Sequence, residues 1–229
     1  MVTTFTRTLP SVEATDAMGL ALAELLRPGD VVALRGELGA GKTTLVRAIA
    51  IGLGVDARAV SSPTYVVINQ YDIPVGTRPL AGGQLLHIDA YRLHGAEDLE
   101  SLGWDRLFDA DTRLAAGLAA AVVEWPERIA PALPDRDRLA DIELVDLGRD
   151  ARRMKVTLPS TWSTRPGYEW FVEREPILCR TSKRWVPPTA ATYPFTDQRA
   201  KDADLYGWLS GSYTTSREVE PTDEPEEPA

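Results

Sequence analysis

Gly36-Glu37-Leu38-Gly39-Ala40-Gly41-Lys42-Thr43 is the stretch that decides the fold, because it fits the pattern G-x-x-x-x-G-K-[ST]. An apolar run at 31–34 precedes it, and a stretch with helical periodicity at 44–53 follows it. A strand, a glycine-rich turn and a helix in this order form a cradle for phosphate groups. Glycines serve there because residues without a Cβ let several backbone N–H groups converge on one anion. The sequence therefore predicts the phosphate-binding loop of a P-loop nucleotide hydrolase.

Two side chains of this loop have predicted roles. Lys42 would reach the β- and γ-phosphates of a nucleotide, and the hydroxyl of Thr43 would hold Mg²⁺. The helix that continues from Thr44 would add free N–H groups and the positive end of its dipole. The pattern alone also occurs as a plain glycine-rich turn, and the flanking strand and helix favour the phosphate site.

Composition narrows the class of protein. The chain has 229 residues, of which 44% are hydrophobic and 26% charged, as in ordinary globular domains. Neither an apolar stretch of about 20 residues nor the apolar centre of a signal peptide is present, so we expect no membrane contact and a cytoplasmic location. The single cysteine, Cys179, excludes an internal disulfide, and with His87 and His94 it does not supply the ligands of a structural zinc site.

The net charge of −9 is concentrated at the end of the chain. Six acidic residues in the last dozen positions account for −6, which leaves −3 for the rest: Glu218, Glu220, Asp223, Glu224, Glu226 and Glu227. A nearly balanced body has no basic surface of the kind that binds nucleic acid by charge. Any contact with RNA is therefore expected through a partner.

The remaining periodicity predicts a three-layer α/β fold, with a P-loop NTPase-like sheet flanked by helices. Ser11 is a plausible N-cap for a helix that ends near Leu26, and an acidic first turn at 95–99 predicts another helix running toward Phe108. The segments 65–68 and 85–88 are predicted to form a long-looped hairpin. Further strands are expected at 119–123, 139–145 and 154–158.

Two acidic residues directly follow apolar runs, Asp89 and Glu124. Because ligands bind at the carboxyl ends of strands in such sheets, we expect both beside the phosphates. A Mg²⁺ ion needs a carboxylate besides the Thr43 hydroxyl, and an attacking water needs a residue to orient it. The alternative interpretation is a solvated acid at a strand end. Similarly, 61–65 could be a simple turn and Trp125-Pro126 a rigid corner.

Together these motifs identify a family. The chain resembles the TsaE family, the bacterial ATPases needed for threonylcarbamoyladenosine modification of tRNA, over about residues 8 to 158. Order and spacing match as well as identity, in the phosphate-binding loop with Thr44, Ser62-Pro63-Thr64-Tyr65, Asp89-Ala90-Tyr91-Arg92-Leu93, Glu97-Asp98-Leu99-Glu100 with Gly103, and Val123-Glu124-Trp125-Pro126. Glu37 departs from the family, which usually has Asp at this position.

The resemblance implies ATP rather than GTP, and Mg²⁺ held by Thr43 and Glu124. It also implies roles in hydrolysis, or in its coupling to a partner, for four residues, namely Ser62, Thr64, Asp89 and Trp125. Gly148-Arg149 matches a Gly-Arg pair that would lie near the nucleotide base. The implied partners are TsaB and TsaD, which act on the adenosine next to the anticodon, so tRNA would be contacted only through the complex.

Two other functions are open to a protein with such a loop. A small P-loop kinase acting on a metabolite usually has an arginine-rich lid, which the sequence lacks. A regulatory GTPase normally has an Asn-Lys-x-Asp motif, and the nearest stretch, Asn69-Gln70-Tyr71-Asp72, has no lysine and comes too early in the chain. The sequence leaves open whether Asp89 or Glu124 orients the attacking water.

Beyond residue 158 the sequence changes character. We expect an ATPase domain at 1–158, a Pro- and Trp-containing C-terminal extension at 159–217 and an acidic disordered tail at 218–229. From Pro159 onward there are nine of the seventeen prolines, which argues against long regular elements, and four of the six tryptophans. This segment could pack on the core, form a small module or order on a partner. Since every motif precedes it, its deletion is expected to leave ATP hydrolysis intact.

Overall fold

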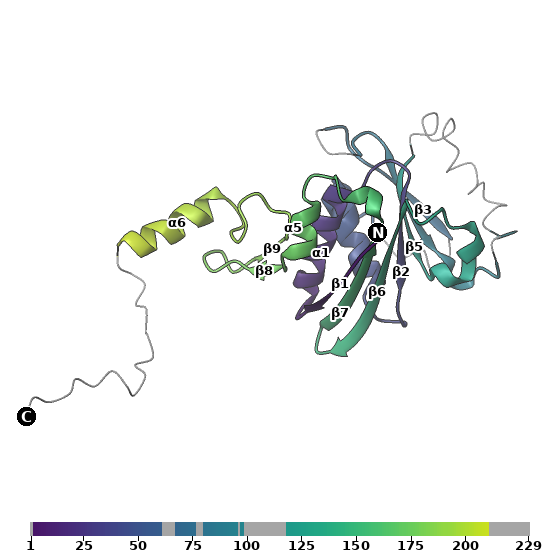
Figure 1. The fold of residues 1–229 in the computed structure, drawn as a ribbon, viewed down its shortest axis with the longest axis horizontal. Helices are drawn as coiled ribbons and strands as arrows, with labels where there is room; N and C mark the ends of the chain where they lie inside the picture. Colours follow the sequence, from purple (N-terminus) through teal and green to yellow (C-terminus); the bar gives the residue numbers. More distant parts are fainter. Residues whose placement is uncertain (1, 61–66, 77–79, 96, 99–117, 211–229) are drawn as a thin grey trace, which may run out of the picture.

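The protein is built on a seven-stranded mixed sheet. The computed structural model describes residues 2–60, 67–76, 80–95, 97–98 and 118–210. The strands are β1 (Thr3–Leu9), β2 (Asp30–Arg35), β3 (Ile68–Asp72), β4 (Gln84–Asp89), β5 (Leu118–Glu124), β6 (Leu139–Gly148) and β7 (Ala151–Leu158), in the spatial order β1-β7-β6-β2-β5-β4-β3 (Figure 1). Parallel pairing joins β2 to β5 and β6, and β4 to β5, whereas the outer pairs are antiparallel. The predicted α/β class is confirmed.

Two helices pack together on one face of this sheet (Figure 1). Helix α1 (Val12–Leu25) begins after Ser11, whose hydroxyl accepts a hydrogen bond from the Ala14 N–H, as the N-cap prediction requires. Helix α2 (Lys42–Leu53) follows the glycine-rich loop. The two helices lie so close together at Gly19 that a Cβ there would come within 2.5 Å of the Ala48 Cβ. Their inward side chains and those of the central strands form one apolar core.

The strand predictions needed three corrections. The strand expected at 65–68 begins only at Ile68 and extends to Asp72, and residues 65 and 66 lie outside the described part. The two closing strands are longer than expected, because their polar residues pair across the β6–β7 hairpin as well. Strand β1 was not predicted, since its Thr-rich sequence has few apolar residues to mark it. It is an edge strand held by pairing with β7, from Thr3↔Leu158 to Leu9↔Arg152.

The opposite face of the sheet carries a second, smaller core. Val31, Ile88 and Val123 point into it from the central strands, and Ile129 of the 3-10 segment η3 (Pro126–Ala132) covers them. Of the helix expected from residue 95 toward 108, only positions 95, 97 and 98 are described: residue 95 is a bend, and 97 and 98 are helical. The third layer of the predicted arrangement thus stays a prediction.

The C-terminal segment begins as part of the main core. Trp162, at the end of the short 3-10 helix η4 (Ser160–Trp162), and Phe171, in helix α5 (Tyr168–Glu173), are completely buried among core residues. Phe171 meets Phe5 of β1 edge to face, with ring centroids 5.6 Å apart. This part of the segment therefore packs on the core, although the domain boundary at residue 158 itself remains a prediction.

Polar contacts add to this packing. The Arg165 guanidinium donates to both carboxylate oxygens of Asp30 at the start of β2, at 2.5 and 3.0 Å, and lies 4.2 Å from the Trp162 ring centroid. Arg7 of β1 donates to the carbonyl of Val172. Burial raises the pKa of Asp30, and the pairing with Arg165 opposes that rise. The first part of the segment is thus tied to the first strands of the sheet by buried charges.

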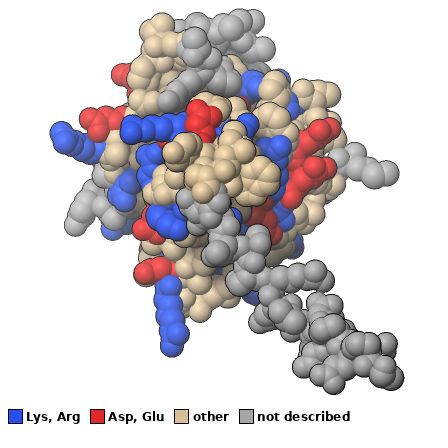
Figure 2. Space-filling model, turned by 90° about the vertical axis from the view of Figure 1, so that its left-hand side faces the viewer, with Lys and Arg blue, Asp and Glu red and all other residues tan. Residues whose placement is uncertain are grey.

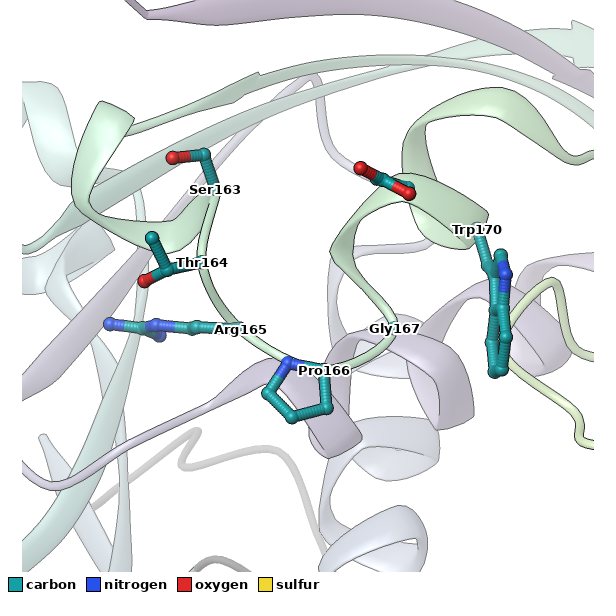
Figure 3. A pocket seen from close by; sticks show the side chains of 7 residues that line it. Ser163, Thr164, Arg165, Pro166, Gly167 and Trp170 are labelled. Atoms are coloured by element: carbon teal, nitrogen blue, oxygen red, sulfur yellow. The ribbon is translucent and has the colours of Figure 1, made fainter.

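An open hollow of about 330 Å³ lies beside this contact, lined by Ser163, Thr164, Arg165, Pro166, Gly167, Glu169 and Trp170. The side chains of Arg165 and Trp170 point away from each other in it (Figure 3). The Arg165 guanidinium, which lines the hollow, is already bound to Asp30. None of its lining residues belongs to the predicted site.

The segment continues into a small hairpin, β8 (Ile177–Leu178) with β9 (Trp185–Val186), and a final helix, α6 (Gln198–Leu209). This twelve-residue helix corrects the expectation that the prolines exclude long regular elements, since no proline lies between Pro194 and the helix end. It extends away from the sheet (Figure 1), and Leu205, Tyr206 and Trp208 are exposed. On the face that includes this segment, basic and acidic side chains are interspersed (Figure 2). Among the described residues no helix has the length and apolar character to cross a membrane.

Candidate functional site

The glycine-rich loop connects β2 to α2 at the carboxyl edge of the sheet. Gly36 has a φ of 138°, and a Cβ there would lie 2.3 Å from the Leu144 carbonyl oxygen of β6, so only glycine permits this close approach. Gly41, with a φ of 99°, is the N-cap of α2. The first N–H groups of a helix have no partner within it, so those of α2 face the loop interior as anion donors.

Lys42 lies across the mouth of this loop. Its Nζ donates to the carbonyl oxygens of Gly36 at 2.7 Å and Glu37 at 3.0 Å, and it lies 3.9 Å from the ring centroid of Trp125. Burial lowers the pKa of the ammonium, and the nearby carboxylates, Glu124 first and then Asp89, oppose that shift. The Lys42 ammonium is therefore held at the loop by two carbonyl oxygens, which phosphate oxygens could replace.

Glu124 joins two elements at this point. Its Oε1 accepts a hydrogen bond from the Thr43 hydroxyl at 2.9 Å and lies 2.9 Å from Nε2 of His87. Only 3% of Glu124 and none of His87 is exposed to solvent. A hydroxyl and a carboxylate in contact beside a phosphate-binding loop fit Mg²⁺, which is usually held by one or two carboxylates together with substrate phosphates and waters.

In the sequence His87 was considered only as a zinc ligand, and its contact with Glu124 was missed. It reaches Glu124 because β4 and β5 pair in parallel, with His87 beside Val122 and Asp89 beside Glu124. To donate to the carboxylate, Nε2 must carry a proton, and Nδ1 has no hydrogen-bond partner among the described residues. The sequence signal was its position two residues before Asp89, on the same face of the strand.

Asp89 and Glu124 end neighbouring strands, β4 and β5, and are partners in the register of this pair. Asp89 accepts a hydrogen bond from the Tyr91 N–H at 3.1 Å, and burial raises the pKa of its carboxyl group. Trp125 follows Glu124 with a φ of 58°, a conformation that L-residues seldom adopt, and its ring lies 5.2 Å from that of Tyr91. The strained backbone turns the indole over Lys42.

The other predicted residues are distributed around this centre. Leu38 at the loop tip is 87% exposed, and Gly39 and Thr44 continue the loop and the helix on either side of Gly41. Gly148 and Arg149 form the turn between β6 and β7, with φ values of 80° and 51°. Ser62 and Thr64 lie outside the described residues.

Arg152 is a second residue that the sequence did not single out. It lies on β7, and its Nε donates to the Ala40 carbonyl of the glycine-rich loop at 3.0 Å. Its Nη1 donates to Asp146, which in turn accepts from the Gly148 N–H at 2.8 Å. No sequence signal marks it, because the contact depends on how the β6–β7 hairpin lies against the loop.

Known proteins are similar to this chain in sequence and in fold. The family model described as threonylcarbamoyl adenosine biosynthesis protein TsaE matches residues 9–154. The tRNA threonylcarbamoyladenosine biosynthesis protein TsaE of Streptomyces coelicolor is 41% identical over 150 residues, which cover 64% of this chain and 93% of that protein. The Bacillus subtilis protein of the same name is 37% identical over 145 residues, covering 63% of this chain and 80% of that protein.

Among solved structures, the crystal structure of Bacillus subtilis YdiB matches with a TM-score of 0.51 at 30% sequence identity, covering 69% of this chain and 87% of that one. The family model covers more than half of the chain and includes the glycine-rich loop, both strand-end acids and the β6–β7 turn. The chain belongs to the TsaE family of tRNA threonylcarbamoyladenosine biosynthesis proteins.

Proposed function

We propose that this protein is the Mg²⁺-dependent ATPase of tRNA threonylcarbamoyladenosine biosynthesis. The observation that carries the proposal is the contact between Thr43 and Glu124, 2.9 Å apart beside the glycine-rich loop. It brings the two expected metal ligands together from a helix and a strand that are far apart in the sequence. The names of the relatives support the pathway.

The residues of the loop would bind the triphosphate. Its backbone N–H groups would surround the β-phosphate, and Lys42 would exchange the carbonyls of Gly36 and Glu37 for phosphate oxygens. Mg²⁺ held by Thr43 and Glu124 would supply neutralisation of the charge on the phosphates. Trp125 would cover the lysine side of this site and limit the access of water.

Asp89 is the better placed of the two acids to orient the attacking water. Glu124 is engaged by Thr43 and His87, whereas Asp89 is half-buried at the end of the adjacent strand. Thr64, which precedes β3 in the sequence, remains a proposed participant. Gly148 and Arg149 would lie near the base, at the turn that Asp146 and Arg152 connect to the loop.

The proposed partners are TsaB and TsaD, with tRNA contacted only through them, and the proposed location is the cytoplasm. The near-neutral charge of the chain before its last dozen residues supports indirect contact with tRNA. Exposed apolar residues at the edge of the site, Leu38 and Tyr91, are suited to contact another protein.

Phosphate release from ATP in the absence of any acceptor tests the proposal. We expect slow release that depends on Mg²⁺ and changes when TsaB and TsaD are added. Glu124→Gln should retain the fold, since glutamine can still contact Thr43 and His87. It should lower the rate of phosphate release by about 100-fold or more. In metal sites, replacing a residue that only hydrogen-bonds to a metal ligand already lowers metal affinity or activity by about 10–100-fold.

Glu143→Gln, which changes an exposed glutamate of β6, is the matched control and should behave as the wild type. Normal turnover by Glu124→Gln would reassign the metal carboxylate. Strict dependence on a small acceptor would instead indicate a kinase, and preference for guanine nucleotides a GTPase.

A further inference from the structure

Arg152 holds the glycine-rich loop from outside. Its guanidinium lies against Gly41, so that a Cβ at position 41 would come within 3.4 Å of Nε, and it donates to the Ala40 carbonyl at 3.0 Å. Only 15% of the side chain is exposed. The contact spans 112 positions in the sequence and joins the last strand of the sheet to the loop.

This hydrogen bond determines the direction of a neighbouring N–H group. In a trans peptide the C=O and N–H groups point in opposite directions. The Ala40 carbonyl belongs to the same peptide unit as the Gly41 N–H. Because the Ala40 carbonyl points toward Arg152, the Gly41 N–H points away from Arg152, and we infer that it faces the anion site of the loop.

Two cations thus bind different carbonyls of the loop. Lys42 contacts the carbonyls of Gly36 and Glu37 from the inside, and it must leave them to reach a phosphate. Arg152 contacts the loop from outside, so its hold can persist when a nucleotide binds. It is also fixed by Asp146, at 2.9 Å, whose carboxylate caps the turn that carries Arg149.

We propose that Arg152 is a positioning residue, which orients the Gly41 amide toward the phosphates of ATP and is itself aligned by Asp146. The inference rests on the proposed function, since it assumes that the loop binds ATP. It also connects the phosphate site with the Gly148-Arg149 turn through one chain of hydrogen bonds. Loss of these hydrogen bonds should weaken phosphate binding without disturbing the hydrophobic core.

Calorimetric titration of ATP with Mg²⁺ into the full chain tests this role. Arg152→Met keeps the unbranched stem over Gly41 and removes every donor, so we expect ATP affinity to fall about tenfold, the lower end of the effect of a charge-assisted hydrogen bond. Arg152→Lys should recover part of the affinity, because one ammonium can reach Ala40 but cannot also form the fork to Asp146. Thermal unfolding of each variant should stay near that of the wild type.

The matched control is Arg153→Met. Arg153 is the next residue of the same strand and, by alternation, faces the other side of the sheet, beside Thr6, Glu143 and Lys155. The Arg153→Met variant loses the same charge as Arg152→Met and should bind ATP as the wild type does. Equal affinities for Arg152→Met and Arg153→Met would overturn the inference, whereas a wild-type chain that binds no ATP would overturn the proposed function instead.

Asp146→Asn serves as the second variant, in case Arg152→Met does not fold. Asparagine can still accept from the Gly148 N–H but no longer holds the guanidinium by charge. Reduced ATP affinity with an unchanged melting temperature would support the positioning role. Unchanged affinity would show that the Asp146–Arg152 pair serves the hairpin alone and would overturn the inference.

Discussion

Single side chains at the loop are already placed for a charged ligand. Lys42 is kept among two carbonyls, an indole ring and the carboxylates of Glu124 and Asp89. A buried ammonium is costly in free energy unless such dipoles and negative charges surround it. The Lys42 ammonium is therefore positioned where a phosphate would bind.

The role of this lysine leads to a prediction. Lys42→Ala removes a charge-assisted contact worth about 1.5–3 kcal/mol, so ATP affinity should fall roughly ten- to hundredfold. Calorimetry would measure this fall, with Lys155→Ala, an exposed lysine on β7, as the control. Equal affinity in the two variants would remove Lys42 from the phosphate site.

At the scale of elements, the short helices after β7 complete the hydrophobic core. Trp162 is fully buried and packs with residues of α1 and the sheet, yet its Nε1 has no hydrogen-bond partner among the described residues. A buried donor without a partner lowers stability, whereas the ring itself contributes packing. The two parts of the side chain thus have opposite effects.

These opposite effects separate two variants. Trp162→Ala should destabilise the protein by about 3–5 kcal/mol, because it leaves a cavity of aromatic size. Trp162→Phe keeps most of the ring, removes the unpaired N–H and should cost far less. Urea unfolding measures both changes, and equal losses would mean that the indole is not part of the core.

At the scale of the whole molecule, the packing changes the expectation that everything after residue 158 is dispensable. The segment 160–173 brings Trp162, Phe171 and Arg165 onto the sheet, whereas α6 contributes only Ala200 as a buried residue. We expect a chain ending at residue 197 to remain folded and to bind ATP. A chain ending at residue 158 should lose its cooperative thermal transition and, with it, ATP binding.

Thermal unfolding and ATP titration of both shortened chains test this expectation. The chain ending at 197 removes the exposed Leu205, Tyr206 and Trp208, so its solubility should not fall. A folded, ATP-binding chain ending at 158 would show that the first 158 residues suffice, and would restore the boundary predicted from the motifs.

Local pattern carried a large part of the prediction. Several features can be read along the chain because each depends on near neighbours: the glycine-rich loop, the α1 cap at Ser11, and the apolar runs of β2, β4 and β5. The placing of Asp89 and Glu124 at one edge follows from the rule that parallel strands end together. The mixed α/β class and family membership followed from the same residues.

Tertiary structure alone decided the contacts between distant segments. Thr-rich β1 is a strand because β7 pairs with it, and Trp162 is a core residue because the chain after residue 158 returns to the sheet. His87 and Arg152 belong to the site through partners 37 and 112 positions away. Such contacts leave no periodicity in the sequence, since the free energy that selects them comes from packing and charge pairing in the folded molecule.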